Sequence, residues 1–186
     1  AGAIVCFLFV LGLLLVKGPY KWALLVATFF SFALAWGKNW MWLTELFFEY
    51  FPLYSKFRSV SSILIVAEVT VPLLGFLALK QIMDGTVDKK SINKNLYISA
   101  GITGGLCLIF ALFGKSLFTF TSSYDANIAS QLPGWAYSAI VEERAIMFRN
   151  DSFRSFLFIL LSAATVWLFA NNLIKKSWMI AILGVL

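Results

Sequence analysis

Four residues near one another in the chain have the types and spacing for anion binding at a membrane surface. Lys56 and Arg58 follow Pro52 among aromatic residues, and an apolar run begins directly after them. Basic side chains at such a boundary meet anionic head groups, while aromatic rings stay at the interface. Ser61 and Ser62, where the apolar run begins, can cap a helix or donate to a phosphate. The pattern therefore predicts lipid-phosphate binding by these two basic residues and two serines.

Glu68 is the one acid in the apolar run that continues to Leu79. It lies eight residues after Val60, which in a helix is about 12 Å along the axis. An ionisable group there is costly and by default faces a bundle interior or a wet cavity. Pro72 cannot donate to the Glu68 carbonyl, which predicts a kink. We interpret Glu68 as an intramembrane polar site. The alternative, a kinked helix whose Glu68 bonds a neighbouring helix, stays open.

The composition identifies the class of protein that must position these residues. The chain is 61% hydrophobic and 17% aromatic, and only 13% of its residues are charged, whereas a soluble domain carries about twice that charged fraction. Cys6 and Cys107 lie in apolar runs without metal-site spacing, and the chain has no His, so no metal site is predicted. The basic residues form no nucleic-acid motif, which excludes nucleic acid as a partner.

The predicted fold class is all-α, a polytopic helical membrane protein in which residues 1–186 form one transmembrane domain. The predicted spans are residues 2–16, 22–36, 60–79, 95–113, 155–173 and a truncated 177–186. Residues 39–51 and 135–149 are expected to be interfacial helices, because charged residues interrupt their apolar and aromatic sequence. The chain begins and ends within apolar sequence, which indicates a piece of a longer protein.

The short loops set the expected orientation. The loops after the first, third and fifth spans are rich in lysine, including Lys17, Lys89 and Lys176. Short loops rich in Lys and Arg stay in the cytoplasm. The segment that contains Arg58 and the long loop before residue 135 are therefore both expected to face outward.

Residues 52–61, Pro-Leu-Tyr-Ser-Lys-Phe-Arg-Ser-Val-Ser, resemble the P-x-(Y/F)-x-x-F-R-x-(P/V)-(S/A) segment of the bacterial YfhO family. The flanking sequences at 33–37 and 73–75 fit the same pattern, particularly that of Bacteroides-type members. The resemblance covers essentially the whole chain as a central fragment of a longer polytopic protein of the bacterial inner membrane and cell envelope.

This resemblance implies a relative of the GT-C glycosyltransferases, which take sugar from a polyprenyl-phosphate donor on the outer face of the membrane. The implied partners are membrane lipids, the polyprenyl-linked substrate, the remainder of the longer chain and other membrane subunits. No cofactor is implied for this chain. The family's catalytic acid lies in an N-terminal region that is absent here, so the catalytic residues are unknown. Arg58 is the residue expected to pair with the donor phosphate.

Two other functions remain open on the sequence. A transporter or flippase for a lipid-linked saccharide would use Glu68 and the Pro72 kink as its moving part, although no internal repeat supports it. A noncatalytic subunit of a larger membrane assembly would account for the excess of aromatic residues. An outward-facing acid pair in the N-terminal region would favour the glycosyltransferase.

Overall fold

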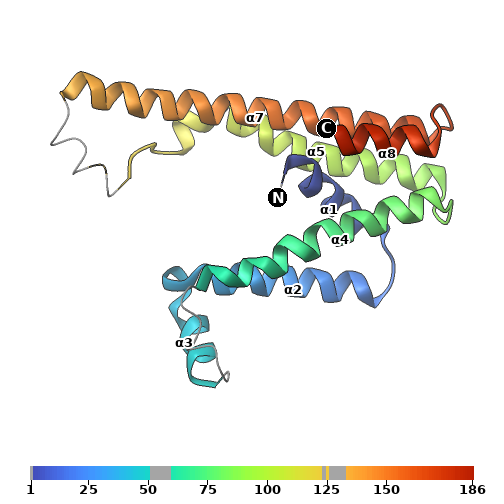
Figure 1. Cartoon of the computed structure of the whole chain (residues 1–186), viewed down its shortest axis with the longest axis horizontal. Helices are drawn as coiled ribbons and strands as arrows, with labels where there is room; N and C mark the ends of the chain where they lie inside the picture. Colours follow the sequence, from blue (N-terminus) through green and yellow to red (C-terminus); the bar gives the residue numbers. More distant parts are fainter. Residues whose placement is uncertain (1, 51–59, 123–124, 126–132) are drawn as a thin grey trace. The chain divides into compact units, whose positions relative to one another are not determined.

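A computed structural model describes residues 2–50, 60–122, 125 and 133–186. Every regular element in these ranges is helical, and they contain no strand. The elements are α1 (Ala3–Leu15), α2 (Pro19–Ala35), η1 (Gly37–Trp40), α3 (Met41–Tyr50), η3 (Val60–Ile63), α4 (Leu64–Met83), α5 (Lys89–Leu117), α7 (Gly134–Ala170) and α8 (Lys176–Val185) (Figure 1).

Within the part of the chain that the structure describes, three helices, α4, α5 and α7, are long and apolar enough to cross a membrane. Three shorter helices, α1, α2 and α8, are also apolar. The predicted class, an all-α helical membrane protein, is confirmed. The particular membrane stays a prediction, because length and composition do not distinguish one bilayer from another.

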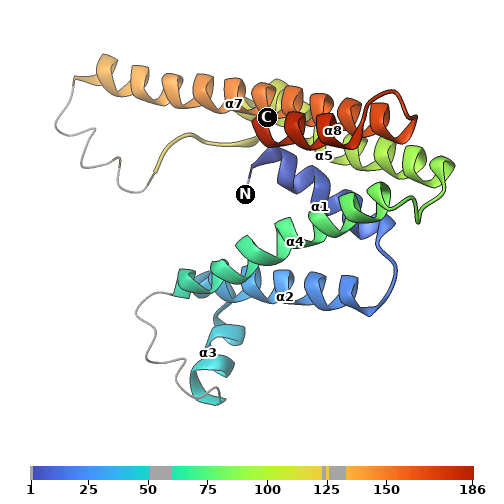
Figure 2. The ribbon, with the colours of Figure 1, turned by 45° about the vertical axis from the view of Figure 1, so that its right-hand side comes forward.

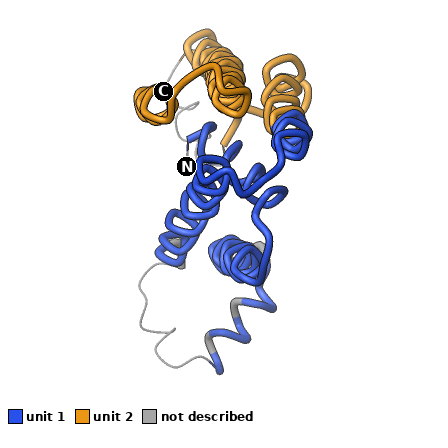
Figure 3. Tube along the Cα trace, turned by 90° about the vertical axis from the view of Figure 1, so that its right-hand side faces the viewer, with its two compact units in different colours: residues 1–99 blue, residues 100–186 orange. Residues whose placement is uncertain are grey.

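The chain divides into two compact units, residues 1–99 and 100–186 (Figure 3). The first unit is built around α4, against which both α1 and α2 pack (Figure 2). The second unit contains the C-terminal part of α5 together with α7 and α8, and α8 packs on α7.

The α1–α4 interface depends on two glycines that face leucines on the opposite helix. A Cβ atom at Gly12 would lie 2.6 Å from the backbone oxygen of Leu74, and one at Gly75 would lie 2.9 Å from Cβ of Leu8. Each glycine therefore makes room for the other helix, as small residues do in membrane interfaces. The two leucines that the glycines face, Leu8 and Leu74, are buried in this interface.

Hydroxyl groups join α2 to α4. The Oγ1 atoms of Thr28 and Thr70 are 2.7 Å apart and buried. Each is also within hydrogen-bonding distance of a carbonyl in its own helix, Leu24 and Val66 respectively. Since a hydroxyl has a single hydrogen, one threonine donates across the interface while the other donates to its own helix. The Ser31 hydroxyl donates to the Ile63 carbonyl at 2.7 Å and so holds the beginning of α4 against α2.

Helix α7 differs from the sequence prediction. Residues 135–149 and 155–173 were expected to form an interfacial helix and a separate span, but the structure joins them in one helix, Gly134–Ala170. Three of the polar residues between them have partners within the helix. Ser152 donates to the Phe148 carbonyl at 2.8 Å, and Arg154 lies 3.5 Å from Asp151 one turn away.

Candidate functional site

The predicted phosphate-binding residues lie at the limit of the described structure. Lys56, Arg58 and the Ser61 side chain lie outside the described residues, so their grouping stays a prediction. Ser62 is described in η3 and is exposed. The chain passes directly from η3 into α4, so a candidate membrane span begins within a few residues of the predicted site.

Glu68 lies on α4 and its side chain is exposed. Because α4 has 20 residues, every 18-residue stretch of it contains Glu68. The buried face of α4 is formed instead by Ala67, Thr70, Val71 and Leu74. Among the described residues Glu68 has no ion pair or side-chain hydrogen bond, so it does not face the interior of its own helical unit. The helix continues through Pro72 without ending.

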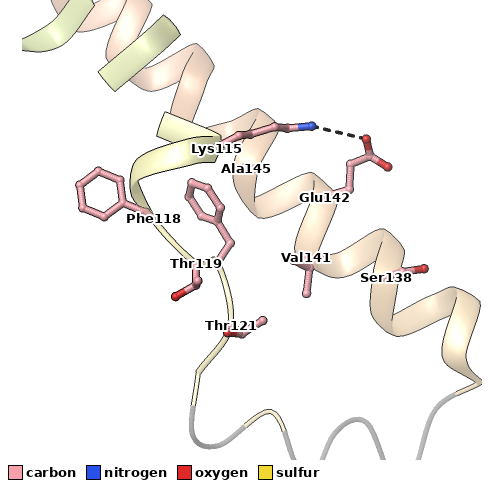
Figure 4. Close-up of a pocket in the computed structure, with 9 residues that line it drawn as sticks. Lys115, Phe118, Thr119, Thr121, Ser138, Val141, Glu142 and Ala145 are labelled. Carbon is pink, nitrogen blue, oxygen red and sulfur yellow. Dashed lines mark ion pairs between the residues drawn. The ribbon is translucent and has the colours of Figure 1, made fainter. Parts of the chain in front are cut away.

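The second unit contains a hollow that the sequence did not predict. It has a volume of about 410 Å³ and lies between residues 115–121, where α5 ends, and the first turns of α7. Figure 4 shows the close-up. The lining residues are Lys115, Phe118, Thr119, Phe120, Thr121, Ser138, Val141, Glu142 and Ala145. Its walls thus combine aromatic rings, hydroxyl groups and two charged side chains.

One charged pair and an aromatic cluster border this hollow. Lys115 Nζ lies 3.6 Å from Glu142 Oε1, and both side chains are more than half exposed, so the pair contributes little to stability. The rings of Phe110, Phe118 and Phe120 each lie within 6.0 Å of the Phe148 ring, centroid to centroid. Tilted and edge-to-face contacts of this kind fix the rings against α7.

Asp125 and Arg144 form a two-pronged ion pair, the Asp125–Arg144 clamp. Arg144 donates to both carboxylate oxygens, at 2.7 and 3.2 Å, and also donates to the Phe120 carbonyl at 3.1 Å. The Ser122 backbone N–H donates to the same carboxylate at 2.9 Å. Asp125 is buried, with 5% of its side chain exposed. These donors, Arg144 first, hold the pKa of the Asp125 carboxyl below its ordinary value of 3.8.

The clamp is suited to positioning rather than to proton transfer. Hydrogen bonds from Arg144, Ser122 and Tyr137 occupy the Asp125 carboxylate, and a lowered pKa makes it a poor base at neutral pH. Its effect is to hold residues 120–122, part of the hollow's wall, against α7. No group of three or more acidic, Cys or His residues in the described ranges could hold a metal ion.

The sequence offered only a weak signal for this arrangement. Arg144 falls within the predicted interfacial helix 135–149, and Asp125 falls within the long loop before residue 135. The two are 19 residues apart, so only the packing of the segment before α7 brings them together.

Comparison with protein-family models, with curated proteins and with solved structures finds no match for the chain.

Proposed function

We propose that the chain is the membrane-embedded part of a protein that transfers sugar from a polyprenyl-phosphate donor on the outer face of the bacterial inner membrane. The proposal rests on the position of the motif at residues 52–61, which is continuous in sequence with η3 and α4. This motif, which contains Arg58, runs into η3, which leads directly into α4, a helix long and apolar enough to cross a membrane. A phosphate head group attached to a long isoprenoid chain needs this combination of a basic group and an adjoining apolar span.

The chemistry of the proposed phosphate site follows from its residue types. The guanidinium of Arg58 can pair with two phosphate oxygens at once, whereas the ammonium of Lys56 acts as a point charge. The exposed Ser62 hydroxyl in η3, directly before the N-terminus of α4, can donate a hydrogen bond to an anion. The hydrogen bond from Ser31 to Ile63 keeps this helix start in place.

The hollow in the second unit has the composition of a shallow saccharide site. Sugars present apolar faces and hydroxyl edges, which match rings such as Phe118 and polar groups such as Thr119, Thr121 and Glu142. Its volume of about 410 Å³ is within the range of small-molecule sites. The sequence also predicts an outward orientation for this loop, the face on which the lipid-linked sugar would be presented.

Binding of polyprenyl phosphate to the purified protein in lipid nanodiscs tests the proposal. Replacing Arg58 by Ala should weaken binding about tenfold or more, since hydrogen bonds to charged groups contribute about 1.5–3 kcal/mol. Arg58→Lys should also weaken binding, because the charge remains but the fork of donors is lost. Glu49→Gln is the control and should bind normally. Unchanged affinity in a folded Arg58→Ala variant would contradict the proposal.

A further inference from the structure

Lys115 and Glu142 reach toward each other from the two walls of the hollow in the second unit. Lys115 comes from the last turn of α5 and Glu142 from the first turns of α7 (Figure 4). The Nζ–Oε1 distance of 3.6 Å is longer than that of a charged hydrogen bond, about 2.7–2.9 Å. The ammonium therefore keeps donors, and the carboxylate keeps acceptors, for another molecule. Both side chains are exposed, so a ligand in the hollow can contact both.

The chain supplies few other charges near the hollow. Between Lys115 and Glu142 the sequence has one charged residue, Asp125. Its carboxylate is buried and lies 2.7 Å from the Arg144 guanidinium, so the Asp125–Arg144 clamp adds no net charge. Among the described lining residues only Lys115 and Glu142 are charged. A ligand in the hollow therefore meets one positive and one negative group, which balance.

A hydroxyl is the polar group that suits both members of this pair. It donates to a carboxylate and accepts from an ammonium, so two neighbouring hydroxyls of a sugar ring can bind Glu142 and Lys115 together. A charged substituent would be attracted by one member of the pair and repelled by the other. Because the attraction and the repulsion oppose each other, the cost of removing the charged substituent from water is left uncompensated.

Phe118 supplies an apolar surface beside the pair. Its ring lies edge-to-face against the rings of Phe110 and Phe148, at centroid distances of 5.7 and 5.5 Å. These contacts fix the ring, yet 45% of the residue remains exposed. Val141 and Ala145 continue the apolar wall on α7. The C–H face of a sugar ring can lie on such a wall while its hydroxyls bind the charged pair.

We infer that the hollow takes a neutral sugar, and that the Lys115–Glu142 pair selects it over acidic and amino sugars. The selection comes from the balance of charge, since removal of either partner leaves a single charge that favours a ligand of the opposite sign. The inference rests on the proposed function only in taking the hollow as a saccharide site. It makes no use of Arg58 or of the lipid phosphate, so the two can fail separately.

Binding of methyl glycosides to the purified protein in lipid nanodiscs tests the selection. Methyl glucoside, methyl glucuronide and methyl glucosaminide share one ring and are neutral, negative and positive respectively. The galacto and manno series provide the same comparison for other ring configurations. Ligand-observed NMR titrations give the dissociation constants. We expect the native protein to bind the neutral glycoside of its preferred series about fivefold or more tightly than either charged one.

Neutralising one member of the pair should change the preference rather than abolish binding. Glu142→Gln leaves the Lys115 charge unbalanced, so the preference should move toward the glucuronide by about fivefold, which two unit charges about 4 Å apart produce even in water. Lys115→Met should move it toward the glucosaminide by a similar factor. Glu143→Gln is the matched control, because it changes the net charge equally but Glu143 does not line the hollow. Its preference should equal that of the native protein.

Three results would overturn the inference. The first is the absence of binding of the neutral glycoside in all three series by folded protein. The second is a native preference for a charged glycoside. The third is an equal shift in Glu142→Gln and Glu143→Gln, which would place the effect outside the hollow. Selective binding of a neutral glycoside, with polyprenyl phosphate unaffected by Arg58→Ala, would contradict the proposed donor site and support this inference.

Discussion

The two units of the chain hold their helices together by different means. In the first unit, α1 and α4 meet through Gly12 and Gly75, and α2 and α4 meet through neutral hydroxyls. In the second unit, the end of α5 and the first half of α7 are joined by phenylalanine rings and by charged groups, including the Asp125–Arg144 clamp. Close backbone approach dominates one unit, and long side chains dominate the other.

The difference follows from the surroundings that each interface requires. Between apolar helices in lipid there is no hydrophobic driving force, so contact depends on close packing and on hydrogen bonds between neutral groups. The clamp and the Lys115–Glu142 pair precede the apolar part of α7 in sequence, where water can solvate exposed charges. The packing chemistry thus differs between the two units in the way that the expected solvent differs.

The largest effect that separates the two kinds of packing is expected at Gly12. Replacing it by Ala places a Cβ against the backbone oxygen of Leu74, so α1 and α4 must move apart. We expect a loss of about 1–3 kcal/mol, measured by reversible unfolding in detergent. Gly101→Ala is the control, because a Cβ there meets nothing within 4 Å. Equal stability of the two variants would show that close approach is not what holds α1 to α4.

Breaking the clamp should act locally in the second unit. Arg144→Gln removes the donors to Asp125 and Phe120, so residues 118–122 should lose protection. Amide hydrogen exchange in this segment should become faster by about tenfold or more, while unit 1 stays unchanged. Glu142→Gln, which alters only an exposed pair, should have no effect. Equal exchange in both variants would show that Arg144 does not position the segment.

The clamp should also give a defined dependence on pH. The folded-state pKa of Asp125 lies below 3.8, so its stabilising contribution is complete above that value and is lost as pH falls through the lowered pKa. The difference in melting temperature between the protein and its Asp125→Asn variant should therefore be constant from about pH 8 to about pH 5. It should shrink only below 3.8. A difference that disappears near neutral pH would rule out this pair as its cause.

The smallest expected effect concerns the hydroxyl contact in the first unit. Thr70→Val removes one partner of the Thr28 hydroxyl, which still has the Leu24 carbonyl as an acceptor. We expect a loss of about 0.6 kcal/mol, the typical value for hydrogen bonds between membrane helices. A double-mutant cycle with Thr28→Val in detergent measures the coupling. A coupling above about 2 kcal/mol would make this contact, rather than Gly12, the main support of the unit.

The sequence predicted helices well because their signal is local. Long apolar runs indicated the spans, and α1 starts within one residue of its expected position. The join in α7 was missed because the charged residues within 135–149 indicated a separate interfacial helix, whereas Asp151, Ser152 and Arg154 have partners within one continuous helix. A local pattern does not show whether a polar stretch ends a helix or continues it.

The sites were less predictable because they depend on which faces are covered. Gly101, Gly104 and Gly105 were expected to allow close helix approach. A Cβ at Gly101 or Gly105 would meet nothing within 4 Å, whereas a Cβ at Gly104 would lie 3.4 Å from the Phe156 ring. The closest contacts are at Gly12, Gly75 and Gly114, where a Cβ would lie 2.6, 2.9 and 2.8 Å from the nearest atom. Likewise, the position of Glu68 within an apolar run was evident, but its exposure was not. Which face of a helix is covered by another helix depends on tertiary packing, and a single sequence without aligned relatives does not specify that packing.

The continuity of α7 has a mechanical consequence. A single helix of 37 residues is a rod of about 55 Å, nearly twice the hydrocarbon thickness of about 30 Å. A tilt of about 10° about its C-terminal end moves the N-terminal end sideways by about 10 Å, by the geometry of that rod. Ser138 and Glu142, which line the hollow, lie near this moving end. A small change in packing around the apolar C-terminal half of α7 would therefore produce a much larger displacement of its N-terminal end, at the hollow.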